Sequence, residues 1–188
     1  GIYLPVWLEG VSNDYIKSIK ITPNIDEELV EITVKSAAKS AKLTFFNKIL
    51  EIPTNEIYKL KVHDPILWTC DNPHLYNFTV ETENDKISSY FAMRKFSTVI
   101  DKNGHRRLAL NNKPLFMKGI LDQGYFDQGW LTPRSEMDYI NDILLCKQLG
   151  FNVLRKHIKI ETLRWYYHCD RLGVIVWQDF VNGGSSYN

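Results

Sequence analysis

The sequence has little cysteine, no excess of charge of one sign and no long apolar run. Its three cysteines, Cys70, Cys146 and Cys169, lack the spacing of a metal or redox motif, so we predict buried free thiols. The 23 basic and 22 acidic residues nearly cancel, which argues against a nucleic-acid partner. No run approaches the roughly 20 apolar residues of a membrane span, so we expect no membrane partner. What is present fits a globular chain of one or two domains.

Apolar and polar residues alternate between about residues 16 and 100. Every second residue is apolar in residues 30–34 and 58–62, a period that is typical of half-buried antiparallel strands. Further strand-like runs, separated by Pro, Asn and Asp turns, lie at residues 42–48, 76–82 and 86–96. The resulting six or seven strands predict an immunoglobulin-like β-sandwich over residues 13–101.

After Leu115 the spacing changes to an α/β pattern. The predicted elements are strands at residues 115–120, 152–155 and 174–177 and helices at residues 136–149 and 162–172. Gly173 directly follows the second predicted helix, and glycine commonly ends helices. The apolar face of the first helix is predicted to run through Met137, Ile140, Ile143, Leu144 and Gln148. Short, β-branched strands that alternate with helices indicate a parallel sheet.

Three parallel strands and two helices are less than half of an eight-fold barrel, which needs roughly 200 residues or more. The chain also begins at Gly1, without an initiator methionine, and runs directly into a strand-like segment. We therefore predict that residues 102–188 form the N-terminal part of a truncated TIM (β/α)8 barrel. The alternative is a complete small open α/β sheet, which would leave apolar faces and an edge strand uncovered. From a severed barrel we expect self-association of the fragment through its exposed edges.

Four segments resemble glycoside hydrolase family 2, the group of β-galactosidases, β-glucuronidases and β-mannosidases. GIYLPVWLE resembles the end of the family's jelly-roll sugar-binding domain, which assigns residues 1–12 to that domain. ILWTCDNPHLYNFTVET, residues 66–82, resembles the end of its immunoglobulin-like domain. NNKPLFMKGILDQGY resembles its first barrel strand, and RWYYHCDRLGVIVWQD resembles its second barrel helix and third strand. The resemblance extends over nearly all 188 residues.

The resemblance implies that the parent enzyme is β-galactosidase-like and hydrolyses terminal β-linked sugars with retention, through two carboxylates about 5 Å apart. In the family both glutamates follow later barrel strands, so we expect no catalytic residue in this chain and no activity from it alone. Glu136 and Glu161 are the only glutamates after Lys102, and we expect both to open helices, where the macrodipole stabilises them. The resemblance implies a carbohydrate substrate and no cofactor.

Three candidate sugar-binding residues lie at or just past the carboxyl ends of the second and third predicted strands, where the active sites of α/β barrels are built. Arg155 is placed like an arginine that the wider clan uses to orient the nucleophile carboxylate, a task that suits a guanidinium fork. His157 lies near the histidine with which the family contacts sugar hydroxyls. Asp179 is the third, an acceptor for sugar hydroxyls.

Three more residues complete the candidate set. Trp177 precedes Asp179 by two residues and would cover the apolar face of a sugar, although a place in the barrel core is as good a reading. Asp122 and Gln123 follow the first predicted strand and would face the sugar, with turn formation as the alternative.

Other groupings lack the geometry of a site. His168, Cys169 and Asp170 are adjacent on a predicted helix, where successive side chains diverge by about 100°, so we predict no metal site. Residues 183–186, GGSS, lack the lysine of a phosphate loop and are predicted to be a flexible connection.

Two other functions remain open from the residues alone. One is a non-catalytic carbohydrate-binding or adhesion module built on the β-sandwich, which would bind glycans without the part of the chain after about Ile100. The other is a small stand-alone α/β enzyme that uses Arg155, His157 and Asp179.

Overall fold

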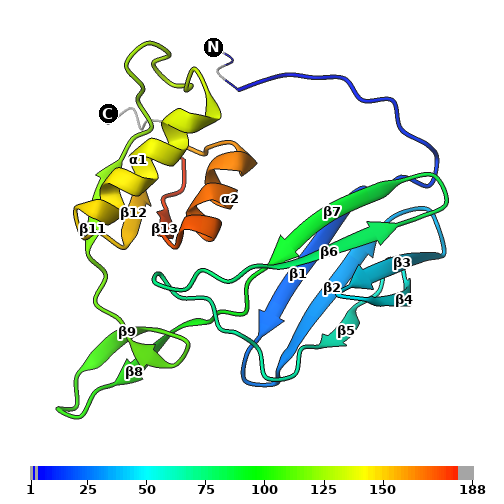
Figure 1. Ribbon diagram of the computed structural model, residues 1–188, viewed down its shortest axis with the longest axis horizontal. Coiled ribbons are helices and arrows are strands. Elements are labelled where there is room, and N and C mark those ends of the chain that lie inside the picture. The colour runs from blue at the N-terminus through cyan, green and yellow to red at the C-terminus, as the bar shows by residue number, and fades with distance from the viewer. Residues whose placement is uncertain (1, 3, 182–188) are drawn as a thin grey trace, which may run out of the picture. The chain divides into compact units, whose positions relative to one another are not determined.

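The computed structural model describes residue 2 and residues 4–181, and the chain forms two compact units (Figure 1). The β unit comprises Leu8–Thr69 and His74–Pro114, and the α/β unit comprises Gly1–Trp7, Cys70–Pro73 and Leu115–Asn188. The predicted connection at residues 183–186 lies outside the described residues. No helix of the described part is long and apolar enough to cross a membrane.

Two antiparallel sheets share one core in the β unit. The first has the order β1-β2-β5, with β1 (Ser18–Asn24), β2 (Leu29–Lys35) and β5 (Tyr58–Lys61). The second has the order β4-β3-β6-β7, with β3 (Ser40–Phe45), β4 (Lys48–Pro53), β6 (Tyr76–Glu81) and β7 (Lys86–Phe91). Side chains from both sheets meet in the core, among them Val30, Ile32, Leu43 and Val80, which are fully buried. Burial of each such side chain is worth about 1.5–3 kcal/mol, so the period-two pattern fixes which face of each strand turns inward.

A third antiparallel sheet ends the β unit. Its order is β10-β9-β8, with β8 (Phe96–Ile100), β9 (Arg106–Leu110) and β10 (Lys113–Pro114). Asn111 and Asn112 connect β9 to β10 and both have positive φ, which is the requirement of a type I′ hairpin turn. The Asn111 side chain also donates a hydrogen bond to the carbonyl of the buried Trp68, at 2.9 Å.

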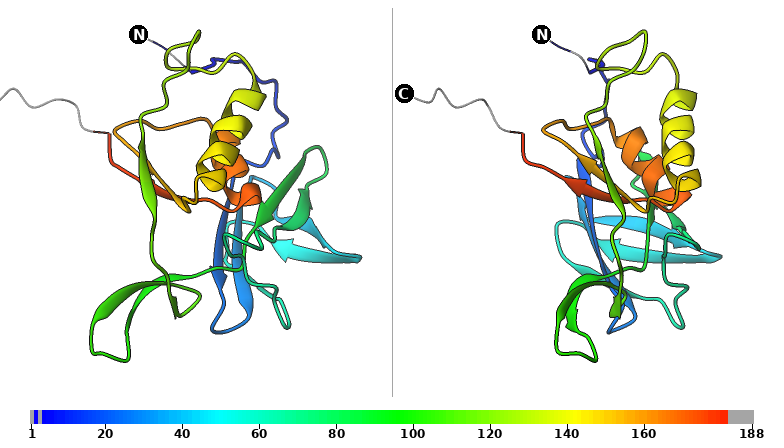
Figure 2. Two further views of the ribbon diagram at one scale, coloured as in Figure 1. Left: turned by 60° about the vertical axis from the view of Figure 1, so that its left-hand side comes forward. Right: turned by 90° about the vertical axis from the view of Figure 1, so that its left-hand side faces the viewer.

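The α/β unit contains one parallel sheet with the order β11-β12-β13. Its elements follow each other as β11 (Gly119–Asp122), α1 (Glu136–Gln148), β12 (Val153–Lys156), α2 (Leu163–Leu172) and β13 (Ile175–Gln178). Both helices lie on the same side of the sheet (Figure 2). Tyr139 and Ile143 of α1 pack there with Trp165 and Cys169 of α2 and with Leu154 of β12.

The first parallel strand begins later than predicted, at Gly119 instead of residue 115. The side chain of Asn152 accepts a hydrogen bond from the backbone N–H of Lys118 and donates one to the carbonyl of Phe116, at 2.8 and 3.0 Å. These contacts occupy backbone groups that a longer β ladder would use, so pairing with β12 starts only at Gly119 opposite Val153.

The buried stripe of α1 differs in part from the predicted face. Ile143 is buried as predicted, but the other fully buried residue is Tyr139, whereas Met137 and Leu144 are 53% and 38% exposed. A helix presents residues four apart on one face, and here the stripe that includes the tyrosine packs against α2 and β12. The sequence pattern alone did not single out this stripe, because apolar residues occur on both sides of α1.

Candidate functional site

The parallel register aligns two of the predicted residues, Arg155 and Trp177, with Leu121 across the sheet. Leu121, Arg155 and Trp177 occupy equivalent positions on β11, β12 and β13. Because side chains alternate along a strand, all three lie on the face opposite to Leu154, which belongs to the helix-side core. We call this face the open face. Leu121 and Trp177 are 52% and 51% exposed, so the open face is accessible in this chain.

Arg155 and Asp179 form a bidentate ion pair on the open face. The guanidinium donates from Nε to Asp179 Oδ1 at 3.1 Å and from Nη2 to Oδ2 at 3.0 Å. The hydrogen bonds and the charge of Asp179 raise the pKa of Arg155 above its ordinary value. The backbone N–H of Asp179 donates to the carbonyl of Lys156, which places the carboxylate just past the end of β13. The fork is therefore oriented toward a carboxylate, and Asp179 occupies its acceptor position.

His157 and Gln123 contact each other two positions beyond Arg155 and Leu121 along the chain. Gln123 Nε2 lies 2.9 Å from His157 Nδ1. In this arrangement the amide nitrogen of Gln123 donates and Nδ1 of His157 accepts. The backbone N–H of His157 donates to the carbonyl of Asp122 at 2.9 Å, which extends the β11–β12 ladder to this pair. The structure thus brings His157 and Gln123 together, next to the Arg155 row.

Asp122 lies on the other side of the sheet. It stands opposite Lys156 in the register and accepts a hydrogen bond from Lys156 Nζ at 2.8 Å. Its other carboxylate oxygen accepts the backbone N–H of Gly124 at 2.7 Å, two residues on, which is the geometry of an Asx-turn. Both oxygens are therefore engaged within the protein.

A buried charge cluster, formed by Asp122, Lys156, Lys159 and Glu161, lies between the helices and the loops that follow β11 and β12. Glu161 Oε1 accepts from Lys156 Nζ at 3.1 Å and lies 2.8 Å from Lys159 Nζ. The side chains of Lys156 and Glu161 are completely buried. Lys159 also donates to the carbonyls of Gly124 and Leu131, so it ties the β11–α1 loop to the β12–α2 loop.

Sequence reasoning missed this cluster, and it assigned Glu161 wrongly. Glu161 precedes Thr162, the N-cap of α2, and contacts lysines instead of the helix terminus, whereas Glu136 is in the first turn of α1 as predicted. A signal was present: Lys156 follows the core residue Leu154 by two positions, so in a strand it must share the inward face. A buried lysine requires a buried carboxylate nearby.

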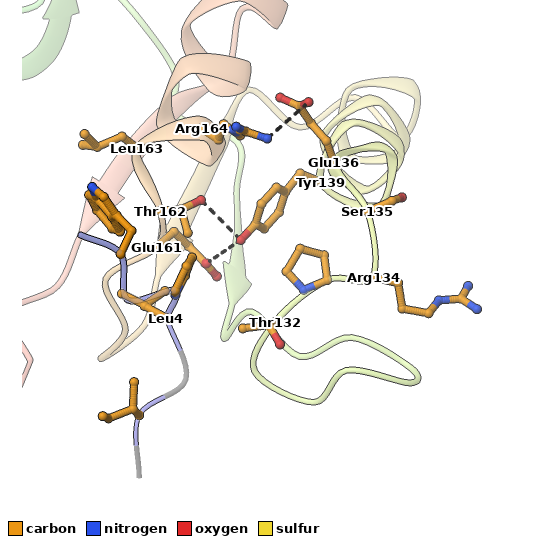
Figure 3. A pocket seen from close by; sticks show the side chains of 14 residues that line it. Leu4, Thr132, Arg134, Ser135, Glu136, Tyr139, Glu161, Thr162, Leu163 and Arg164 are labelled. Carbon is orange, nitrogen blue, oxygen red and sulfur yellow. Dashed lines mark hydrogen bonds and ion pairs between the residues drawn. The ribbon is translucent and has the colours of Figure 1, made fainter. Parts of the chain in front are cut away.

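Tyr139 closes the cluster on the side of α1. Its hydroxyl donates to Glu161 Oε2 at 3.3 Å and accepts from Thr162 Oγ1 at 3.4 Å (Figure 3). Burial, reinforced by the negative charge of Glu161, raises the pKa of Tyr139 to about 12. The phenol therefore stays protonated at neutral pH and acts as a hydrogen-bond donor.

The cysteines and acidic side chains do not assemble a metal site. Within the described residues no three His, Cys, Asp or Glu side chains gather where they could hold a metal ion. All three cysteines are free, but only Cys169 is fully buried, since Cys70 and Cys146 retain some exposure. Burial raises the pKa of the Cys169 thiol strongly, which makes it an unreactive core residue.

A cavity of about 1030 Å³ lies elsewhere in the α/β unit, at the N-terminal ends of α1 and α2 (Figure 3). Its walls include Arg134, Glu136, Tyr139 and Arg164, together with residues of the N-terminal segment. None of the six predicted sugar-binding residues lines it. The cavity is therefore separate from the predicted sugar-binding residues and from the open face.

Comparisons with known proteins agree with the motifs. Residues 36–94 match the family model for "Glycosyl hydrolases family 2". A β-galactosidase of Photobacterium profundum is 33% identical over 121 residues, which covers 62% of this chain and 11% of the relative. A β-galactosidase of Thermoanaerobacter pseudethanolicus is 22% identical over 201 positions, covering 95% of this chain and 27% of the relative.

The solved β-D-glucuronidase of Dictyoglomus thermophilum superimposes with a TM-score of 0.76 at 21% identity, covering 93% of this chain and 31% of that one. At this identity the likeness concerns the fold, a β-rich arrangement with several antiparallel sheets. The chain spans about a quarter or less of the lengths of the two curated β-galactosidases. Taken together, the matches confirm the resemblance to glycoside hydrolase family 2 that the sequence motifs predict.

Proposed function

We propose that this chain is part of a retaining, exo-acting β-glycosidase that cleaves terminal β-linked sugars and is β-galactosidase-like. In this proposal residues 1–12 are the end of a jelly roll, residues 13–101 an immunoglobulin-like sandwich and residues 102–188 the first part of a (β/α)8 barrel. Support comes from the two antiparallel sheets with a common core and from the parallel β11-β12-β13 sheet with both helices on one side. The matching curated relatives quoted above are both called β-galactosidases.

The observation that carries the proposal is the alignment of polar side chains at and just past the carboxyl ends of the parallel strands. Arg155 with Asp179, and His157 with Gln123, form two hydrogen-bonded pairs next to Trp177. Carboxyl ends of parallel strands are where barrel enzymes build active sites. In the complete enzyme Arg155 would orient the nucleophile carboxylate, and His157 and Asp179 would contact sugar hydroxyls.

We propose further that this polypeptide alone does not hydrolyse glycosides. Retaining hydrolysis needs two carboxyl groups about 5 Å apart beside the scissile bond. Asp179 is bound by Arg155. Asp122 and Glu161 share Lys156, but they lie on the helix side, and Glu161 has no room beside it for a sugar because its side chain is completely buried.

The test is hydrolysis of p-nitrophenyl β-galactoside, β-glucuronide and β-mannoside by two proteins: the 188-residue chain and the complete product of the gene that encodes it. We expect no turnover by the chain and turnover of one glycoside by the complete protein, with retention of anomeric configuration. Turnover by the 188-residue chain would instead support a stand-alone α/β enzyme. An inactive complete protein would contradict the glycosidase proposal itself.

Self-association of the chain is part of the same proposal. Among the described residues no strand pairs with the outer edge of β13, and Phe180 and Val181, which follow it, are 97% and 55% exposed. Unpaired edges and apolar surface favour association. Sedimentation velocity should show oligomers that dissociate on dilution, whereas a monomer at all concentrations would contradict this part.

A further inference from the structure

A groove of about 460 Å³ crosses the outer surface of the four-stranded sheet in the β unit. Thr44, Thr79 and Ser88 line it and stand in one cross-strand row on β3, β6 and β7. Asn77 lies two residues before Thr79 on the same strand face, and Phe46 lies at the end of the groove. Neighbouring strands are roughly 4.8 Å apart, so the three hydroxyls span about 10 Å on a rigid platform.

Four polar side chains of this groove are not engaged by other groups of the described protein, whereas the hydroxyl of Tyr76 accepts a hydrogen bond from the backbone N–H of Ile66 at 2.7 Å. Among the described residues, Thr44, Asn77, Thr79 and Ser88 form no side-chain hydrogen bond with the rest of the chain. Elsewhere in the β unit a strand hydroxyl does form a side-chain hydrogen bond: Ser40 Oγ, on the same strand as Thr44, donates to Glu51 at 2.8 Å. The groove therefore presents hydroxyl and amide groups that are fixed in position and available to a ligand.

Phe46 combines an unfavourable backbone conformation with an exposed side chain, so its contribution to fold stability does not explain its presence. It occupies the first position of the two-residue loop between β3 and β4, with φ of +51°, where short hairpins normally carry glycine. The ring is 70% exposed, yet it is fixed by contacts with the rings of Phe45 and Tyr76, at centroid distances of 4.4 and 6.0 Å. A bulky residue in a left-handed conformation with little burial suggests a functional role for the exposed ring.

The charge of the groove narrows the class of ligand. Its lining contains no Lys, Arg, Asp or Glu, and its one imidazole, that of His74, packs edge-on against the ring of Tyr76 at a centroid distance of 4.5 Å. The next cross-strand row carries Glu51, Lys42, Glu81 and Lys86, whose formal charges sum to zero, and Lys86 pairs with Glu81 there at 3.3 Å. Phosphates, nucleic acids and acidic polymers would find no cation in the groove, whereas hydroxyls, an amide and an exposed ring suit a neutral polyhydroxylated ligand.

We propose that this groove is an accessory binding site for an uncharged glycan chain. The ring of Phe46 covers the apolar face of one sugar, and the side chains of Thr44, Thr79, Ser88 and Asn77 hydrogen-bond the hydroxyls of that sugar and its neighbour. The site lies entirely in the β unit and involves no residue of the open face. It therefore goes beyond hydrolysis and would bring polymeric substrate to the protein.

Phe46→Gly is the most discriminating variant, because glycine adopts φ of +51° without strain and the loop should fold at least as well as in the parent chain. Thr79→Val removes one hydroxyl at nearly constant shape. Phe96→Ala is the matched control, since Phe96 is 49% exposed on β8 and does not line the groove.

The experiment is native affinity electrophoresis of the 188-residue chain in gels that contain galactan, galactomannan or xylan, with polygalacturonate as the anionic comparison. We expect at least one neutral polysaccharide to retard the chain and the Phe96→Ala control, and polygalacturonate not to do so. Phe46→Gly and Thr79→Val should weaken retardation by about tenfold and severalfold. Thermal unfolding should show that both variants remain folded.

No retardation by any neutral polysaccharide would overturn the proposal, and so would equal retardation of folded Phe46→Gly. Retardation by polygalacturonate alone would show that the neutral ligand class is wrong. None of these outcomes affects turnover by the complete enzyme, so a failure of the groove and a failure of the glycosidase proposal are distinguishable.

Discussion

Replacement of Glu161 by glutamine should destabilise the α/β unit by about 3 kcal/mol, because it removes the charge that two buried lysines share. Glutamine keeps the shape of the side chain and one acceptor oxygen. The four charges of the buried cluster sum to zero in the native chain, and the substitution leaves one uncompensated positive charge. Breaking a buried pair on one side costs about 3–5 kcal/mol.

The structure places the cost in the lower part of that range. Lys156 keeps Asp122, whose carboxylate lies 2.8 Å from Nζ, and its ammonium also lies 4.2 Å above the ring of Trp165. Lys159 keeps the carbonyls of Gly124 and Leu131 as acceptors. The variant therefore loses the charge partner of Lys159 but leaves no buried ammonium without any acceptor.

A second substitution tests whether charge is the cause. Glu161→Gln combined with Lys159→Met restores neutrality and should recover half or more of the lost stability, since apolar replacements of buried pairs are often neutral. Glu136→Gln is the control, because Glu136 pairs with His168 and Arg164 while its side chain is 43% exposed. It should cost less than about 1 kcal/mol.

Native-state hydrogen exchange of the amides of α2 measures this stability within the unit that contains the cluster. The free energy of opening should fall by about 3 kcal/mol in Glu161→Gln and rise again in the double variant. A loss below about 1 kcal/mol in the single variant, or no recovery in the double variant, would refute the reasoning.

Three further outcomes follow from the geometry. Ultraviolet titration should show a tyrosine that ionises near pH 12 and is absent in Tyr139→Phe. Because the native state holds this proton more tightly than the unfolded chain, stability should fall as the pH rises from about 10 to 12. Ionisation of Tyr139 near pH 10 in the native chain would contradict the burial. Gly150→Ala should lower the free energy of unfolding by about 1–2 kcal/mol through its positive φ alone. Gly173→Ala should lower it by about 1–3 kcal/mol more, because the new Cβ would collide with the Cys70 carbonyl. Equal unfolding midpoints of the two variants would exclude that contact. Arg155→Met should lower the unfolding midpoint only modestly, since the side chain of Arg155 is 55% exposed, although that of Asp179 is only 16% exposed. It should lower kcat of the complete enzyme by about a hundredfold, and unchanged kinetics would remove the proposed orienting role.

Much of the fold follows from local patterns in the sequence. The alternation in residues 30–34 predicts the buried face of β2, and β12, α2 and β13 each lie within one residue of their predicted bounds. These predictions succeed because periodicity and a helix-ending glycine act over a few residues. The start of β11 was predicted wrongly, because it depends on the side chain of Asn152, which is more than thirty residues away.

The candidate site also has a part that the sequence predicts and a part that only the tertiary structure shows. A strand-end position can be recognised from sequence, and this identified Arg155, His157 and Asp179 as candidates. Their pairing with each other and with Gln123 depends on parallel register, which no local pattern specifies. The sequence also gave no weight to Thr44, Thr79 and Ser88, because ordinary strand hydroxyls become a groove only when three strands align.

By itself the sequence determined the inward faces of the strands, the order of the α/β elements and the resemblance to glycoside hydrolase family 2. Only the tertiary structure decided which charges are buried together. Asp122 and Lys156 are 34 residues apart, yet they meet because parallel pairing sets them side by side, and the same pairing directs Arg155 to the open face. Periodicity is a property of neighbouring residues, whereas charge compensation is a property of the assembled sheet.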